Sequence, residues 1–137
     1  MILKKSKTKW IKIDFIEDIE LFVEYPKIEQ VEKMRELAYQ IMFITPDGET
    51  VVNIPEDKAK RTIIMEKIAK LRIKYCVKDW KGVKAEDGTE IKCNLVKDEL
   101  EKDIYESFIS NLDSYDVIRL GNIIQQETEF NEADKKK

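Results

Sequence analysis

The spacing of apolar residues changes at Pro26, and this change constrains the fold more than any other feature of the chain. Before it, from Trp10 to Tyr25, apolar residues occur in short alternating patches with acidic residues between them. Such alternation is typical of β-strands. We therefore predict a β-hairpin with strands over residues 9–16 and 19–25, joined by an acidic turn. Proline donates no hydrogen bond to a sheet, so the pairing should end at Pro26.

After Pro26, apolar residues recur at steps of three and four. These residues are Ile28, Val31, Met34, Leu37, Ala38, Ile41 and Met42. The spacing predicts an amphipathic helix that ends near Phe43. A second interpretation also fits this stretch, because residues 41–45 and 50–54 flank the turn signal Pro46-Asp47-Gly48 and could form two strands. We favour the helix.

The middle of the chain predicts another helix followed by strands. Pro55-Glu56-Asp57 has the composition of a helix start, and apolar residues at helical spacing continue through Leu71 to about Tyr75. Residues 75–93 then indicate a second hairpin. Gly88 can adopt the positive φ that a tight corner in this hairpin requires.

The C-terminal third has the pattern of two more helices. Asn94 is a candidate N-cap for the first of them, and Asp113 or Ser114 for the second. A chain of 137 residues has the usual size of one domain. We predict a single α+β domain over residues 1–130 and a disordered, lysine-rich tail over residues 131–137.

The composition excludes several classes of function. The chain contains no histidine, which excludes Ser-His triads, histidine-ligated zinc and histidine proton switches. Its 25 basic and 28 acidic residues give a formal charge of -3, which does not favour nucleic acid, and no apolar run is long enough to span a membrane. The four glycines are scattered and form no phosphate-binding loop. We therefore expect no catalytic residue, no cofactor and no metal.

Cysteines and carboxylates are the remaining candidates for chemistry. Cys76 and Cys93 are too few for a zinc site or a disulfide framework, and we predict buried thiols. Carboxylates cluster twice, at Asp14, Glu17, Asp18 and Glu20 and at Glu86, Asp87 and Glu90. Because 39% of all residues are charged, these clusters are interpreted as solvated surfaces. A small enzyme that uses carboxylates is kept as the last of three functional hypotheses.

Trp80 is the most informative single residue, because a large aromatic side chain at the edge of a hairpin either fills a small core or anchors an interface. We favour the core. The candidate partner-binding residues are Trp80 and the first-helix stripe, Val31, Met34, Leu37 and Ile41. Each of them is more readily explained as part of the core.

One segment resembles a known family. Residues 78–91, Lys-Asp-Trp-Lys-Gly-Val-Lys-Ala-Glu-Asp-Gly-Thr-Glu-Ile, follow the apolar run 73–77 and precede a predicted helix. This order is similar to that in small bacteriophage proteins known as tail assembly chaperones. In those proteins a helix leads into an apolar strand, a Trp-x-Gly-Val step, an acidic Asp-Gly turn, a short strand and another helix. The resemblance covers about forty residues.

The resemblance implies a non-enzymatic protein in the cytoplasm of the bacterial host. Such a protein associates with itself and with the helical tape-measure protein while tail tube subunits assemble, and it takes no cofactor. The alternative is a structural virion component, such as a head-tail connector or tail completion protein, into which the second hairpin would dock permanently. We expect no membrane partner and no nucleic-acid partner.

Overall fold

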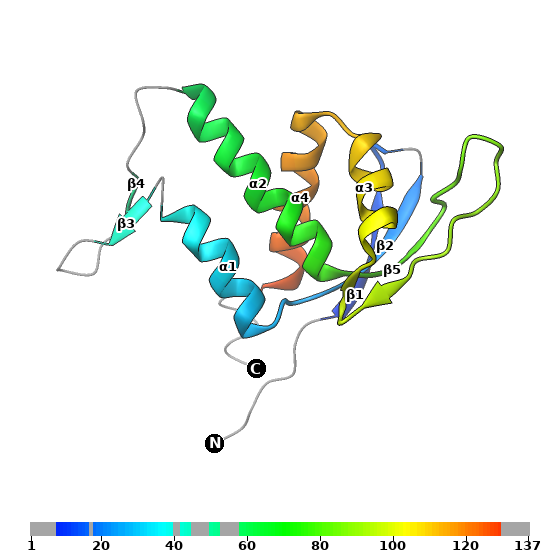
Figure 1. Cartoon of the computed structure of the whole chain (residues 1–137), viewed down its shortest axis with the longest axis horizontal. Helices are drawn as coiled ribbons and strands as arrows, with labels where there is room; N and C mark the ends of the chain where they lie inside the picture. The colour runs from blue at the N-terminus through cyan, green and yellow to red at the C-terminus, as the bar shows by residue number, and fades with distance from the viewer. Residues whose placement is uncertain (1–7, 17, 40–41, 45–49, 53–57, 130–137) are drawn as a thin grey trace, which may run out of the picture.

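A computed structural model describes residues 8–16, 18–39, 42–44, 50–52 and 58–129 (Figure 1). Within these residues the chain forms four helices, one three-stranded sheet and two short two-stranded sheets. The α+β prediction is confirmed. The proposed tail at residues 131–137 lies outside the described residues.

The N-terminal hairpin is confirmed, but its first strand ends at Ile13 and not at residue 16. Strands β1 (Thr8–Ile13) and β2 (Ile19–Glu24) pair antiparallel, with Ile13 opposite Ile19. Every second residue of β2 is buried, as the sequence alternation requires. The pairing stops one residue before Tyr25, ahead of Pro26.

The first helix is shorter than predicted. Helix α1 covers Ile28–Ala38, and the backbone amide of Lys27 donates to Oε1 of Gln30 at 2.9 Å at its start. Strands β3 (Met42–Ile44) and β4 (Thr50–Val52) follow and pair antiparallel. The favoured prediction of a helix to Phe43 is therefore wrong, and the two-strand interpretation is correct. β-Branched and aromatic residues dominate both strands and favour pairing over the last helical turn.

Helix α2 (Lys58–Cys76) is the central element, and strand β5 (Val77–Lys81) follows it without a linker. The second hairpin was predicted incorrectly in two respects. Residues 75 and 76 are helical, and β5 pairs with β2 to give the sheet order β1-β2-β5. Residues 82–91, here called the arm, make one bridge between Lys84 and Glu90 and turn at Gly88, whose φ is +88°.

Asn94 does not cap a helix. Strands β6 (Leu95–Val96) and β7 (Glu99–Leu100) form a tight hairpin instead, because Lys97 and Asp98 both adopt positive φ between them. Helix α3 (Lys102–Ser110) starts after this hairpin, and the carboxylate of Glu101 accepts two backbone hydrogen bonds at its N-terminus.

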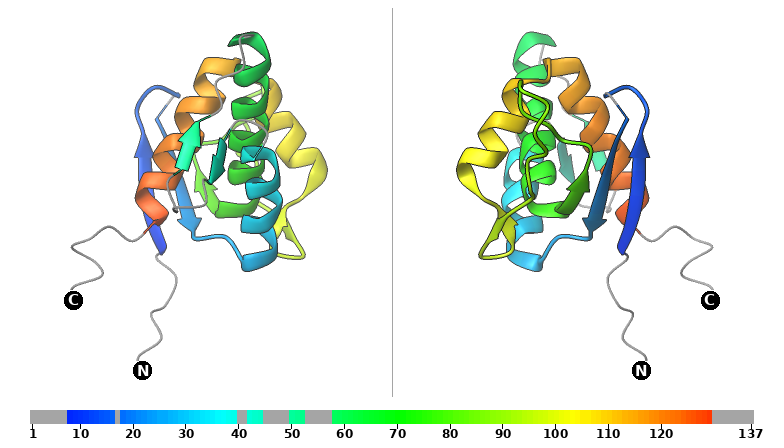
Figure 2. Two further views of the ribbon diagram at one scale, coloured as in Figure 1. Left: turned by 90° about the vertical axis from the view of Figure 1, so that its left-hand side faces the viewer. Right: turned by 90° about the vertical axis from the view of Figure 1, so that its right-hand side faces the viewer.

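Helix α4 (Ser114–Thr128) starts as predicted, because Oδ1 of Asp113 accepts a hydrogen bond from the amide of Asp116 at 2.8 Å. The helices α2, α3 and α4 lie on one side of the sheet, and α1 packs on α2 away from the sheet (Figures 1 and 2). The core is the apolar space between the sheet and these three helices, and it includes Ile13, Leu21, Ile73, Leu100, Leu120 and Ile124.

Candidate functional site

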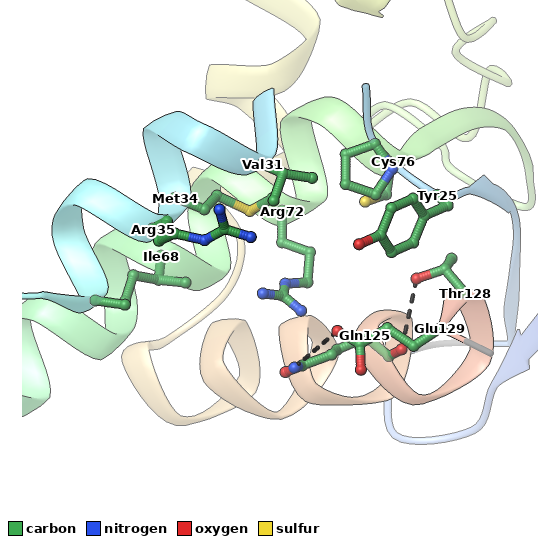
Figure 3. Close-up of a pocket in the computed structure, with 12 residues that line it drawn as sticks. Tyr25, Val31, Met34, Arg35, Ile68, Arg72, Cys76, Gln125, Thr128 and Glu129 are labelled. Atoms are coloured by element: carbon green, nitrogen blue, oxygen red, sulfur yellow. Dashed lines mark hydrogen bonds between the residues drawn. The ribbon is translucent and has the colours of Figure 1, made fainter. Parts of the chain in front are cut away.

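An open groove of about 250 Å³ lies between α1, α2 and α4 (Figure 3). Its walls are largely apolar. Val31, Met34 and Ala38 come from α1, and Ile68 and Cys76 come from α2. This groove is open and partly apolar and lies between three helices, so it is the candidate functional site.

The groove results from the shape of α1. This helix has eleven residues, and only Gln30 and Met34 are buried. Its apolar stripe is therefore too narrow to close the space above α2 and α4. Val31 and Ala38 stay half-exposed along that space.

Two arginines face the groove. Arg35 projects from α1 and Arg72 from α2, and both guanidinium groups point toward the space between the helices (Figure 3). Neither forms an ion pair with a carboxylate of the described residues. By contrast, Lys9 is 2.6 Å from Glu127 and Lys74 is 3.6 Å from Glu99. The groove therefore presents two guanidinium groups that are not ion-paired with a described carboxylate, beside apolar walls.

One carboxylate also borders the groove. Glu129 lies just beyond the last residue of α4, and its Oε1 accepts a hydrogen bond from Nε2 of Gln125 at 3.1 Å (Figure 3). Tyr25 and Thr128 are the remaining polar neighbours at this end, and the hydroxyl of Thr128 donates to the carbonyl of Ile124 at 2.7 Å. Among the described lining residues, two arginines and one glutamate thus leave a net positive charge.

Cys76 lines the groove as a neutral, apolar wall. Its side chain is buried, and burial raises the pKa of the thiol to about 12, against smaller opposing effects of Arg72 and Lys78. Cys93 is half-buried, and burial raises the pKa of its thiol to about 11. Both cysteines are unbridged. A thiol with so high a pKa is a poor nucleophile at neutral pH.

A second hollow of about 90 Å³ lies between α2 and α4. It shares Ile68, Arg72 and Gln125 with the first and extends along α2 to Met65. The two hollows therefore adjoin along α2, and together they are here called the helix groove, whose lining residues on α2 run from Met65 to Cys76 with Arg72 between these ends.

The predicted partner-binding residues fall in different places. Val31 and Met34 line the helix groove. Leu37 is half-buried on α1 outside it, and Ile41 lies outside the described residues. Trp80 does not line either hollow and belongs to the core.

The environment of Trp80 confirms the core interpretation. Its side chain is 6% exposed and stacks on Phe108 with ring centroids 5.4 Å apart. Its indole Nε1 donates to the carbonyl of Ile91 at 2.7 Å and so ties the arm to β5. Such burial leaves little ring surface for a partner.

Sequence reasoning missed both groove arginines. Ile68, Arg72 and Cys76 are spaced four residues apart, so Arg72 falls on the same helical face as two apolar groove residues. A charged residue inside an apolar stripe was the signal that could have identified it. Arg35 gave no comparable signal, because Glu32, Lys33 and Glu36 surround it in the sequence.

The acidic clusters do not converge on a site. Asp14 and Asp18 are exposed, as are Glu86, Asp87 and Glu90 on the arm, and Glu17 lies outside the described residues. Hydrogen bonds from the backbone and side chain of Thr89 lower the pKa of Asp87, which stabilises the arm's turn. No group of three metal-ligating side chains occurs in the described ranges.

In the described part of the chain, no helix combines the length and apolar composition needed to cross a bilayer. Comparison with known proteins returned no match to a family model, to a curated protein or to a solved structure.

Proposed function

We propose that this protein is a non-enzymatic phage tail assembly chaperone that binds tape-measure or tail tube protein in the bacterial host during virion assembly. The observation that carries the proposal is the helix groove, an open apolar surface between three helices that carries two arginines without a described carboxylate partner. A surface of this kind is suited to holding a segment of another polypeptide.

The physical need for such a protein is clear. A long helical tape-measure protein exposes apolar stripes before the tube encloses it, and exposed stripes favour aggregation. A chaperone must cover these stripes reversibly and keep the complex in solution. An open groove in a chain with 39% charged residues meets both requirements.

The segment that resembles the tail assembly chaperones supports the same proposal. Helix α2 leads into β5, which contains Trp80, and Gly82 and Val83 follow. The acidic turn at Asp87-Gly88 comes next, then the bridge at Glu90 and, after the β6–β7 hairpin, helix α3. The order of elements is the order that the resemblance implies, with the β6–β7 hairpin as an addition.

The arm favours the alternative, a structural virion component. It projects from the body of the molecule in Figure 1, and residues 84–90 are exposed. Its base is held by the hydrogen bond between Trp80 and Ile91. A firmly anchored projection is suited to permanent insertion into a ring, as in a head-tail connector.

One experiment separates the two functions. In the first measurement, the chain is co-expressed with the tape-measure and tube proteins encoded beside its gene and purified by affinity tag. In the second, purified phage particles are searched for the chain by mass spectrometry. A chaperone co-purifies with one of these proteins and is absent from particles. Presence in particles at a fixed copy number supports the connector. A metabolic gene neighbourhood, or co-purification with neither protein, contradicts the chaperone function.

A further inference from the structure

We propose that the helix groove recognises an acidic amphipathic α-helix, with its apolar side against α1 and α2 and its carboxylates paired with Arg35 and Arg72. This inference rests on the proposed function and names the chemistry of the partner segment. It predicts which part of a tape-measure or tube protein binds here: a helical stretch with leucine-like residues on one face and Asp or Glu at its border.

The length of the groove fits a short helix. Met65 and Cys76 are eleven residues apart on α2, which corresponds to about 16 Å along the helix axis. That distance accommodates about three turns of a bound helix. Met34 and Met65 line the two parts of the groove, and their flexible side chains can adapt to different apolar partners.

The walls favour a helix over an extended peptide. Three helices form most of the lining, with Tyr25 and Pro26 from the link between β2 and α1 beside them, and the backbone groups of the helices already bond within each helix. Among the described lining residues, an extended peptide would find no strand edge to satisfy its own backbone groups. A helix satisfies these groups internally and needs only apolar and charged contacts from the groove.

The charges select an acidic partner. Arg35 comes from α1 and Arg72 from α2, and both face the groove, so one helix lying in the groove can reach both. Glu129 is the one carboxylate among the described residues that line the groove, and it lies at the end of α4 beside Gln125. The whole chain carries a formal charge of -3, so bulk electrostatics would instead attract a basic peptide. A preference for acidic peptides would therefore be a local property of the groove.

The test uses three synthetic probe helices bound to the full chain and followed by fluorescence anisotropy. Each is a fluorescein-labelled, end-capped 15-residue peptide with leucines at helical spacing. Glutamates flank the leucines in the first peptide, glutamines in the second and lysines in the third. We expect saturable binding of the glutamate peptide, and affinity at least about tenfold weaker for the other two.

Matched variants locate the binding site. R35Q/R72Q removes both groove charges, and K33Q/K67Q removes two exposed charges from the same helices outside the groove. R35Q/R72Q should lower the affinity for the glutamate peptide by about tenfold or more. K33Q/K67Q should lower it by less than about twofold. Circular dichroism checks that both variants keep the melting temperature of the unchanged protein. In methyl NMR spectra, the Met34 and Met65 signals should shift on binding.

Several outcomes would overturn the inference. These are equal affinity for the three peptides and an equal loss of affinity for the glutamate peptide in both double variants. The absence of binding, or binding that shifts neither methionine signal, would also overturn it. Concentration-dependent dimerisation that R35Q/R72Q abolishes would identify a second copy as the occupant, since α1 carries acidic residues and the exposed Ile28, and would also overturn it.

Failure here is distinguishable from failure of the proposed function. If the tape-measure protein co-purifies equally with the unchanged chain and R35Q/R72Q, the chaperone function stands and the groove assignment fails. If the glutamate peptide binds as expected but no tail protein co-purifies, the groove assignment stands and the chaperone function fails.

Discussion

Helices α4 and α1 both pack against α2, but they do so in different ways. Five residues of α4 are buried, including Leu120 and Ile124, whereas α1 buries only Gln30 and Met34. The contact between α4 and α2 belongs to the closed core, and the contact between α1 and α2 borders the helix groove.

Small side chains explain the close contact between α2 and α4. A Cβ atom added to Gly121 would lie 2.7 Å from Cβ and 2.9 Å from Cα of Ala69. The two backbones therefore approach as closely as a Gly-Ala pair allows. The α1 side has larger residues at its contact, Met34 and Ile68, and arginines beside them. Small residues thus let α4 approach α2 closely at Ala69 and Gly121, with the second hollow beside this contact, whereas large side chains and two arginines line the contact between α1 and α2.

The largest effect should come from Trp80→Ala in the closed core. Loss of the ring removes its stacking on Phe108 and leaves a cavity, which should lower the free energy of unfolding by about 3–5 kcal/mol. Urea denaturation followed by circular dichroism measures this loss. Trp80→Phe is the control, because it keeps an aromatic ring and removes the hydrogen bond to Ile91, at a cost of about 1 kcal/mol. An unchanged stability of Trp80→Ala would contradict the core placement.

An intermediate effect is expected from Gly121→Ala. Alanine has the better helix propensity by about 1 kcal/mol, but its methyl group would collide with the backbone of Ala69. We expect a net loss of about 1–3 kcal/mol in chemical denaturation. Asn122→Ala, at the next and exposed position, should be neutral or stabilising. If Gly121→Ala is as stable as the unchanged protein, α2 and α4 are not in close contact.

The smallest effect should come from Val31→Ala on the groove wall. The side chain is half-exposed, and alanine's better helix propensity offsets part of the lost burial, so we expect a change below about 1 kcal/mol. Val117→Ala is the matched control, because Val117 is 1% exposed on α4 and its two buried methyl groups contribute about 1.6 kcal/mol. Equal losses in the two variants would show that the two faces of α2 are equally closed.

Elements with a local cause were predictable from the sequence. The N-terminal hairpin follows from alternation, and the start of α4 follows from the side chain of Asp113, which bonds three residues ahead. The turn at Gly88 was also predictable, because it depends on the backbone conformation of this one glycine. The core placement of Trp80 was favoured for a related reason, since so large an apolar side chain is costly to expose.

Elements were predicted incorrectly where a helix competes with a strand pairing or where the contacts join residues far apart in the sequence. Residues 42–44 fit a helix by spacing, yet they pair with residues 50–52. Asn94 is of a residue type that is common at helix N-caps. However, the positive φ values of Lys97 and Asp98 form the β6–β7 hairpin between Asn94 and the next helix. Such conformations are uncommon for residues other than glycine, so composition does not indicate them. The groove arginines were missed because their surroundings come from three separate helices.

The sequence alone determined the class of this fold, the first hairpin and most helix positions, because periodicity and capping act over a few residues. The tertiary structure decided that β5 pairs with β2, more than fifty residues earlier, and that one face of α2 stays open with Arg35 and Arg72 beside it. These outcomes depend on which surfaces meet and how closely their side chains let the backbones approach.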